Sequence, residues 1–307
     1  MRFAVDVPNF GRWADPKAFA DFARRVEEAG WDGISVWDHI LVEDGLEVAD
    51  PWILLAAAAM VTDRVRLMTM VTPIPRRHPW KLARETVTLD LLSAGRLTLG
   101  VGLGWPTDPE FTRFGGEEDL RVRAEMLDEG LEILAGLWSG EPFGFEGRHY
   151  RLQPVTFRPT PHQQPRIPVW VAATWPRRAP VRRAARWDGI APSFLAIESG
   201  EYRDPTPADV RDLLDEVHRH RTPTPRSTWC SAATPAGLPG SRAPVSPGGG
   251  TGGCRGAGSS TTIGSPASSK ARRGPDAAPS ARADDQLRRH QDVGRAGGGA
   301  AGRHLRA

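Results

Sequence analysis

The sequence has 307 residues, with 40 Lys and Arg against 37 Asp and Glu. Residues 222–307 hold 12 Lys and Arg against 4 Asp and Glu, which leaves 28 against 33 for residues 1–221, so the first part is mildly acidic and gives no basis for specific nucleic-acid binding. The longest apolar run, residues 53–61, is too short to cross a bilayer, and both cysteines lie after residue 221, so neither a membrane protein nor a disulfide framework is expected.

Strand and helix patterns alternate along residues 1–221. Apolar, β-branched runs predict six strands, and amphipathic repeats with Asp-Pro starts and glycine ends predict six helices between and after them. The predicted strands cover residues 2–8, 33–39, 65–75, 96–105, 168–173 and 189–194, and the helices cover 15–29, 50–61, 79–95, 119–137, 179–187 and 207–221. Six successive β/α units predict an α/β fold with a parallel sheet, and their number favours a (β/α)8 barrel over an open sheet.

The last two units of such a barrel are not recognisable after residue 221. Residues 222–307 contain no Phe, Tyr or Glu, and Gly, Ala, Arg, Ser and Pro make up about 70% of them, a composition that cannot form a core. This segment is either a disordered basic extension or an out-of-frame translation of a GC-rich gene. We therefore expect a barrel domain over residues 1–221 and a low-complexity tail over 222–307, with the last two units missing or scrambled.

Candidate catalytic residues follow the second predicted strand. In a β/α barrel the chemistry lies at the carboxyl ends of the strands, and Trp37, Asp38 and His39 stand at such an end. His39 can donate or accept a proton near neutral pH, and Asp38 could fix its tautomer or orientation. The alternative is a helix-capping Asp beside a structural His.

The third and fourth strands end in residues suited to a ligand. Thr69, Met70 and Val71 precede Arg76 and its neighbour Arg77, and hydroxyls, amides and cations at a barrel mouth suit an anionic ligand. The alternative is that the Arg pair only binds surface carboxylates of the protein. After the fourth strand, glycines at positions 100, 102 and 104 indicate close approach of the backbone to a flat ligand, since the dinucleotide-binding glycine spacing is not met.

These segments resemble the bacterial luciferase-like monooxygenase family of flavin and deazaflavin enzymes. The resemblance covers residues 1–221 and rests on the segments ISVWDHI, TMVTPIPRRHPWKLARETVTLDLLSAGRLTLGVGLGW, RAEMLDEGLEILAGLWSGEPFGFEGRHYRL, PRIPVWVAA and RRAARWDGIAP. It implies a (β/α)8 barrel that holds coenzyme F420 or FMN at the strand ends. The Asp38–His39 pair is more typical of the F420-using branch, so F420 is the preferred cofactor.

The resemblance also assigns roles to single residues. His39 would be the acid/base beside the isoalloxazine ring, and Thr69, Met70 and Val71 would contact the cofactor, with Thr69 and Met70 at the position of a non-prolyl cis peptide bond common in the family. Gly102 and Gly104 would leave space for ring and substrate. The segment Ala173, Thr174 and Trp175, expected as a turn after the fifth strand, would meet the cofactor phosphate through backbone amides, and Trp105 and Arg76 would contact substrate.

The resemblance bears on the substrate as well. Sugar-phosphate dehydrogenases of this branch carry a Glu just after the fourth-strand glycines where this chain has Trp105, so a small, more apolar substrate is expected. Residues 141–157 resemble a β insertion over the barrel mouth, whose aromatic residues Phe143, Phe145 and Tyr150 would line a pocket or, alternatively, pack against the barrel.

The implied reaction is hydride transfer between the cofactor and an organic substrate, with His39 relaying a proton; with FMN, reduced flavin could instead activate oxygen. An alternative is a catalytically disrupted remnant whose barrel cannot close, and a further one is nucleic-acid or membrane-surface binding through the tail. The sequence contains no metal-ligand motif, and its N-terminus enters a strand without a signal peptide, so we expect a metal-free cytoplasmic protein. The family often forms homodimers, which is one candidate assembly here.

Overall fold

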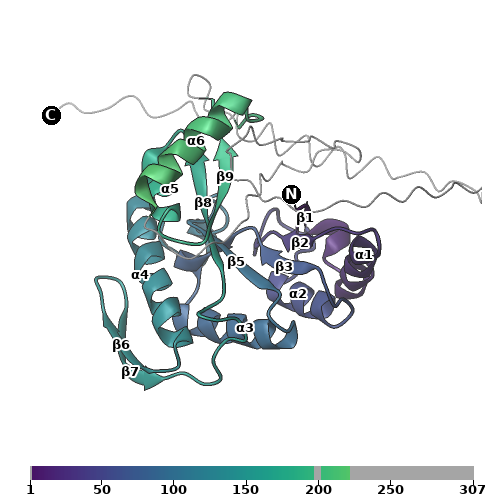
Figure 1. The fold of residues 1–307 in the computed structure, drawn as a ribbon, viewed down its shortest axis with the longest axis horizontal. Coiled ribbons are helices and arrows are strands. Elements are labelled where there is room, and N and C mark those ends of the chain that lie inside the picture. Colours follow the sequence, from purple (N-terminus) through teal and green to yellow (C-terminus); the bar gives the residue numbers. More distant parts are fainter. Residues whose placement is uncertain (1, 197–201, 222–307) are drawn as a thin grey trace, which may run out of the picture. The chain divides into compact units, whose positions relative to one another are not determined.

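A parallel sheet forms the centre of the computed structural model, which describes residues 2–196 and 202–221 (Figure 1). Its strands pair in the order β1-β2-β3-β5-β8-β9, and the short strand β4 (Thr72–Pro73) adds to β5. All these pairings are parallel, which confirms the six predicted strands. The bounds are β1 (Ala4–Val7), β2 (Gly33–Val36), β3 (Arg66–Thr69), β5 (Leu97–Gly102), β8 (Val169–Trp175) and β9 (Gly189–Phe194).

Each predicted helix is present, and local sequence signals explain where they begin. Asp15, Asp50 and Asp119 accept backbone hydrogen bonds from the first turns of α1, α2 and α4, and Thr206 forms a capping box with Asp209 at α6. The α-helices are α1 (Pro16–Glu28), α2 (Pro51–Ala59), α3 (Pro79–Leu92), α4 (Leu120–Trp138), α5 (Arg178–Ala184) and α6 (Pro207–His220), and the 3-10 helices are η1 (Gly11–Trp13), η2 (Ile74–Arg76) and η3 (Thr112–Phe114).

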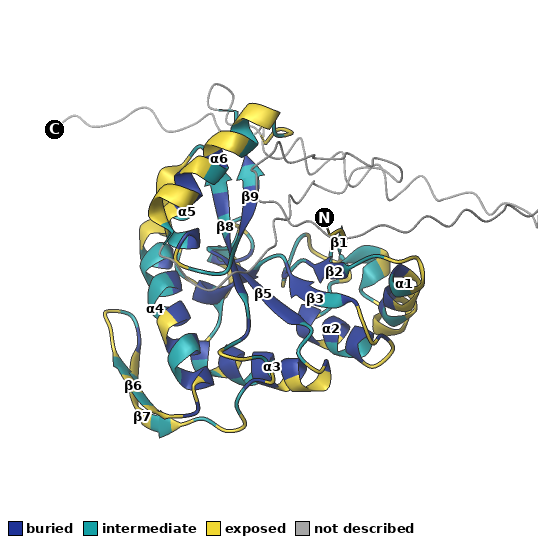
Figure 2. Ribbon diagram, in the orientation of Figure 1, coloured by how far each residue is buried: buried dark blue, intermediate teal, exposed yellow. Residues whose placement is uncertain are grey.

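The core lies between the sheet and its helices. Every residue of β2 and β5 is buried, as expected for strands covered on both faces. Figure 2 shows dark blue, buried residues along the sheet and exposed residues on the outer sides of α1 and α6. None of the helices in the described part of the chain is long and apolar enough to cross a membrane.

The described sheet corresponds to six units of a β/α barrel and not to a closed one. Among residues 2–196 and 202–221, β1 pairs in the parallel sheet with β2 alone, and β9 pairs with β8 alone. The last two predicted units, and the tail that we place at 222–307, lie outside the described residues. The domain boundary at residue 221 therefore stays a prediction.

The predicted β insertion is a hairpin of β6 (Pro142–Glu146) and β7 (Arg151–Thr156), but its expected position was wrong. The Glu129 carboxylate on α4 accepts the backbone N–H groups of Arg148, His149 and Tyr150 at 2.8–3.0 Å. The Phe143 ring occupies the space where Gly136 of α4 would carry a Cβ. These contacts hold the hairpin against α4, beside which it lies in Figure 1, and not over the strand ends.

The aromatic residues of the β6–β7 hairpin consequently pack against the barrel. Phe143 and Phe145 are half-buried against the core, and Tyr150 is buried with its ring edge-on to Trp80 at 6.4 Å between centroids. Of the two roles considered for these rings, packing is the one that the contacts support.

Candidate functional site

The register of the sheet brings the predicted site residues to one edge. Val36 of β2 lies opposite Thr69 of β3, Thr72 of β4 opposite Val101 of β5, and Val101 opposite Val171 of β8. In parallel strands in register, the segments that follow the strands lie side by side. The loops with Asp38 and His39, with Met70 and Arg76, and with Gly104 therefore share the carboxyl edge of the sheet.

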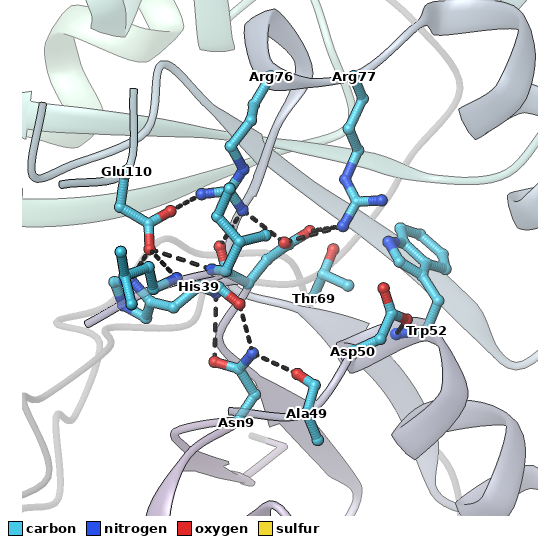
Figure 3. Close-up of polar contacts among 12 residues, drawn as sticks. Asn9, His39, Ala49, Asp50, Trp52, Thr69, Arg76, Arg77 and Glu110 are labelled. Carbon is cyan, nitrogen blue, oxygen red and sulfur yellow. Dashed lines mark hydrogen bonds and ion pairs between the residues drawn. The ribbon is translucent and has the colours of Figure 1, made fainter. Parts of the chain in front are cut away.

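His39 is bound to a residue that the sequence analysis did not identify, Glu110 in the loop after β5. Its Nδ1 lies 3.2 Å from Oε1 of Glu110, and Figure 3 draws both side chains. The same oxygen accepts the backbone N–H groups of Ile40 at 3.1 Å and Leu41 at 3.2 Å. One carboxylate thus holds both the imidazole and the two residues that follow it.

Asn9, after β1, holds the His39 backbone from the other side. Its Nδ2 donates to the His39 carbonyl at 2.8 Å and to the Ala49 carbonyl at 2.6 Å, and its Oδ1 accepts the His39 N–H at 3.2 Å. The rings of Phe10 and Trp37 lie edge-on to the imidazole at 5.9 and 5.8 Å. Both the backbone and the ring of His39 are therefore fixed by neighbours.

Asp38 binds the two arginines and does not orient His39, which corrects the predicted Asp38–His39 pairing. Its carboxylate accepts hydrogen bonds from Arg76 at 2.7 Å and from Arg77 at 2.9 Å, and Arg76 also forms an ion pair with Glu110 (Figure 3). The side chains of Asp38 and Glu110 are 0% and 1% exposed, and those of Arg76 and Arg77 are 8% and 16% exposed. Two buried carboxylates balance two largely buried guanidinium groups, the arrangement that makes buried charge tolerable.

This network leaves Arg76 with its charge satisfied inside the protein. The alternative in which the Arg pair binds protein carboxylates is therefore the one that the structure supports, although the partners are buried and not on the surface. The predicted contact between Arg76 and substrate stays a prediction.

Burial and charge keep His39 neutral. Desolvation, together with the positive charge of Arg76, lowers the pKa of His39 to about 4, and the negative charge of Asp38 opposes this shift. At neutral pH the imidazole is therefore uncharged, and its side chain retains 19% exposure. A neutral imidazole can accept a proton at whichever nitrogen carries no hydrogen.

The fourth-strand glycines are needed for packing within the protein, which corrects the expectation that they leave free space. A Cβ on Gly100 would collide with the Thr69 carbonyl oxygen, one on Gly102 would lie 2.8 Å from the Val71 side chain, and one on Gly104 would lie 2.7 Å from the Phe111 ring. The peptide bond between Met70 and Val71 is cis, one residue beyond the expected pair. Trp105, which follows Gly104, is 70% exposed.

Residues 173–175 belong to strand β8, so the predicted turn at this position was wrong. Pairing with β9 continues through Ala173 and Thr174 to Trp175, which lies opposite Phe194. The hydroxyl of Thr174 lies 3.0 Å from that of Ser193 on β9. The contact of these three residues with a cofactor phosphate stays a prediction.

Comparison with known proteins identifies the family. The family model of luciferase-like monooxygenases matches residues 2–234. The chain belongs to the luciferase-like monooxygenase family. The match runs past residue 221, where we expected the resemblance to end. It places the described β/α units in a family of flavin- and F420-dependent oxidoreductases.

Individual relatives agree with this luciferase-like assignment. An F420-dependent glucose-6-phosphate dehydrogenase of Nakamurella multipartita is 32% identical over 226 residues, which are 71% of this chain and 62% of the relative. The crystal structure of the monooxygenase RslO1 from Streptomyces bottropensis is 31% identical with a TM-score of 0.58, covering 73% of this chain and 68% of that one. An F420-dependent secondary alcohol dehydrogenase in complex with an F420–acetone adduct is 21% identical with a TM-score of 0.59, covering 71% and 64%, and shares the fold.

The chain spans only part of its relatives. It covers 44% to 62% of the length of curated proteins that it matches, among them a Mycobacterium tuberculosis protein that is 41% identical over 128 residues. The described residues account for six β/α units of the luciferase-like barrel.

The residues at the strand ends of this luciferase-like chain fit the ring of a flavin or deazaflavin. The buried Thr72 hydroxyl has no hydrogen-bond partner, and His39 Nε2 has none among the described residues, which leaves two polar groups for the edge of a bound ring. The exposed Trp105 adds an aromatic surface. Within residues 2–196 and 202–221, no group of three or more His, Cys, Asp or Glu is arranged to bind a metal ion.

Proposed function

We propose that this chain is an oxidoreductase that transfers hydride between coenzyme F420, or alternatively FMN, and a small, rather apolar organic substrate. The observation that carries the proposal is His39: in a member of this family, a neutral imidazole is fixed from both sides at the strand ends, and no residue in the described part of the chain binds its Nε2. A positioned imidazole of this kind is suited to general acid/base catalysis.

The cofactor would lie across the strand ends. Thr69, Met70 and Val71 would contact its ring, and Ala173, Thr174 and Trp175 would lie toward its phosphate end. When bound, F420 or FMN supplies the hydride acceptor or donor. The chain's own part is to orient the cofactor, to keep water from the reacting atoms and to move a proton at His39 Nε2.

Two features of the strand ends support an apolar substrate. Trp105 stands where the resemblance places a Glu in sugar-phosphate dehydrogenases, and it exposes 70% of its surface. Arg76, whose charge acts on His39, is engaged by Asp38 and Glu110, so it is a poor ligand for a substrate phosphate. A small alcohol or ketone meets these conditions better than a sugar phosphate.

Two alternatives remain. The 31% identity to a monooxygenase supports an oxygenation, for which reduced FMN would activate oxygen. We prefer F420 because a relative that matches 71% of this chain is F420-dependent. The second alternative is a disrupted remnant of such an enzyme, without a closed barrel. Cytoplasmic localisation and a homodimer likewise stay predictions.

A turnover assay tests the proposal. The chain is mixed with oxidised F420 and a panel of short secondary alcohols, with glucose 6-phosphate as the polar comparison, and loss of the oxidised cofactor's absorbance is followed. We expect turnover with an alcohol and its loss in His39→Asn, because an Asn amide can keep the hydrogen bond to Glu110 while Nε2 is removed. Unchanged turnover in a folded His39→Asn variant, or turnover with the sugar phosphate alone, would contradict the proposal.

A further inference from the structure

Glu110 is a pure hydrogen-bond acceptor toward His39. Its second oxygen forms an ion pair with Arg76, and a carboxylate in such a pair is ionised and carries no hydrogen to donate. The oxygen that faces His39 also receives the N–H groups of Ile40 and Leu41. All three groups around Oε1 must therefore be donors.

This geometry determines which imidazole nitrogen is protonated. A neutral imidazole has one N–H, and a hydrogen bond to a carboxylate 3.2 Å away requires that hydrogen on Nδ1. We propose that Glu110 is a positioning residue that holds His39 as the Nδ1–H tautomer and so leaves Nε2 at the strand ends as a proton acceptor. The catalytic consequence rests on the proposed function, but the tautomer is a property of the chain alone.

The loop that carries Glu110 is itself anchored. The next residue, Phe111, is buried, and the guanidinium of Arg123 on α4 lies 4.1 Å from its ring centroid. Arg123 also donates to the Thr107 hydroxyl at 2.6 Å. Because α4 fixes the loop on both sides of Glu110, contacts within the protein hold the carboxylate against His39.

The network separates two tasks that the sequence analysis gave to one residue. Asp38 neutralises Arg76 and Arg77, whereas Glu110 determines the His39 tautomer. Loss of Glu110 should therefore affect proton transfer and leave the affinity for substrate largely unchanged, since Glu110 is buried and makes its contacts within the protein.

The direct test is nitrogen-15 NMR of the full chain labelled at histidine and free of cofactor, with the His39 signals assigned from their absence in His39→Asn. We expect Nδ1 protonated and Nε2 bare at neutral pH in the original chain, and Nε2–H signal in Glu110→Ala. Glu118→Ala, an exposed residue of the same loop, is the matched control and should leave the tautomer unchanged. If Glu110→Ala does not fold, the spectrum of the original chain decides: Nε2–H there would overturn the inference.

Kinetics give a second readout once turnover is established. We expect kcat of Glu110→Ala to fall about 10²-fold or more, with KM nearly unchanged, because a wrongly set tautomer cannot accept the proton. An Nδ1–H tautomer in a chain that turns over with neither cofactor would refute the proposed function and leave the positioning role standing. A folded Glu110→Ala variant that keeps the Nδ1–H tautomer would refute the positioning role instead.

Discussion

The carboxylate of Glu110 lies 3.2 Å from Nδ1 of His39, although 71 residues separate them in the chain. The pair joins the loop after β5 to the loop after β2, and the ion pairs of Arg76 with Glu110 and Asp38 bring in the segment after β4. Buried charge pairs thus tie three neighbouring strand ends together. Preorganisation of this kind is what a catalytic group needs.

Asp38→Asn should destabilise the fold strongly. The substitution leaves Arg76 and Arg77 short of their shared buried carboxylate, and breaking a buried ion pair costs about 3–5 kcal/mol. Asp44→Asn is the control, because Asp44 forms a solvent-exposed pair with Arg113, and such pairs contribute little to stability. Urea unfolding of the two variants measures the difference, and similar losses in both would show that the Asp38 network contributes little to stability.

Asp6 should make stability depend on pH. On β1 its carboxylate accepts hydrogen bonds from Ser35 and Trp37, and desolvation raises its pKa from 3.8 to about 6. The folded chain then holds a proton that the unfolded chain releases, so the stability that Asp6 provides is complete below pH 3.8 and is lost as pH rises through 6.

Asp6→Asn removes this dependence, because an amide imitates the protonated acid. We expect the variant to gain stability relative to the original chain as pH rises from 4 to 7, measured by thermal melts at several pH values. Asp21→Asn, an exposed residue of α1, serves as control. A constant difference between Asp6→Asn and the original chain across this range would refute the raised pKa.

Gly100→Ala should be far more damaging than Gly45→Ala. The new methyl at position 100 meets the Thr69 carbonyl oxygen in the middle of the sheet, where the backbone cannot yield, and overpacking of this kind costs about 3 kcal/mol. Position 45 has open space and a φ of +82°, so Ala there costs about 1 kcal/mol of backbone strain. Equal melting temperatures for the two variants would mean that β3 and β5 are not packed as described.

Trp105→Ala tests the substrate wall without disturbing the fold. Because the indole is 70% exposed, its removal should leave thermal stability within about 0.5 kcal/mol. If Trp105 contacts an apolar substrate, KM should rise about tenfold, corresponding to about 1.4 kcal/mol of lost binding, while kcat changes little. Phe114→Ala, also exposed, is the control; the same KM in both variants would exclude Trp105 from the substrate site.

The fold was predictable where its signals are local. Asp50 followed by Pro51, for example, marks the start of α2 by capping, and the buried run at 97–102 marks β5. Strand β8 was predicted too short because Thr174 and Trp175 are strand residues only through their pairing with β9. The position of the β6–β7 hairpin likewise depends on Glu129, a contact that no local pattern encodes.

The site was predictable in part for the same reason. His39 stands at a strand end that the β/α order identifies, but no local pattern identifies its partners. Glu110 is one of several acids in a loop 71 residues away, and Asn9 follows the first strand; only their strand-end positions were a signal. Asp38 was paired with His39 because they are adjacent, whereas neighbouring residues that leave a strand can point to different partners.

A fluorescence titration of the full chain with F420 and, in parallel, with FMN tests the central claim most directly. The account predicts saturable one-site binding of a cofactor, tighter for F420, and nearly the same affinity in His39→Asn, since His39 is assigned to proton transfer. Absence of saturable binding to either cofactor by a folded chain would contradict it.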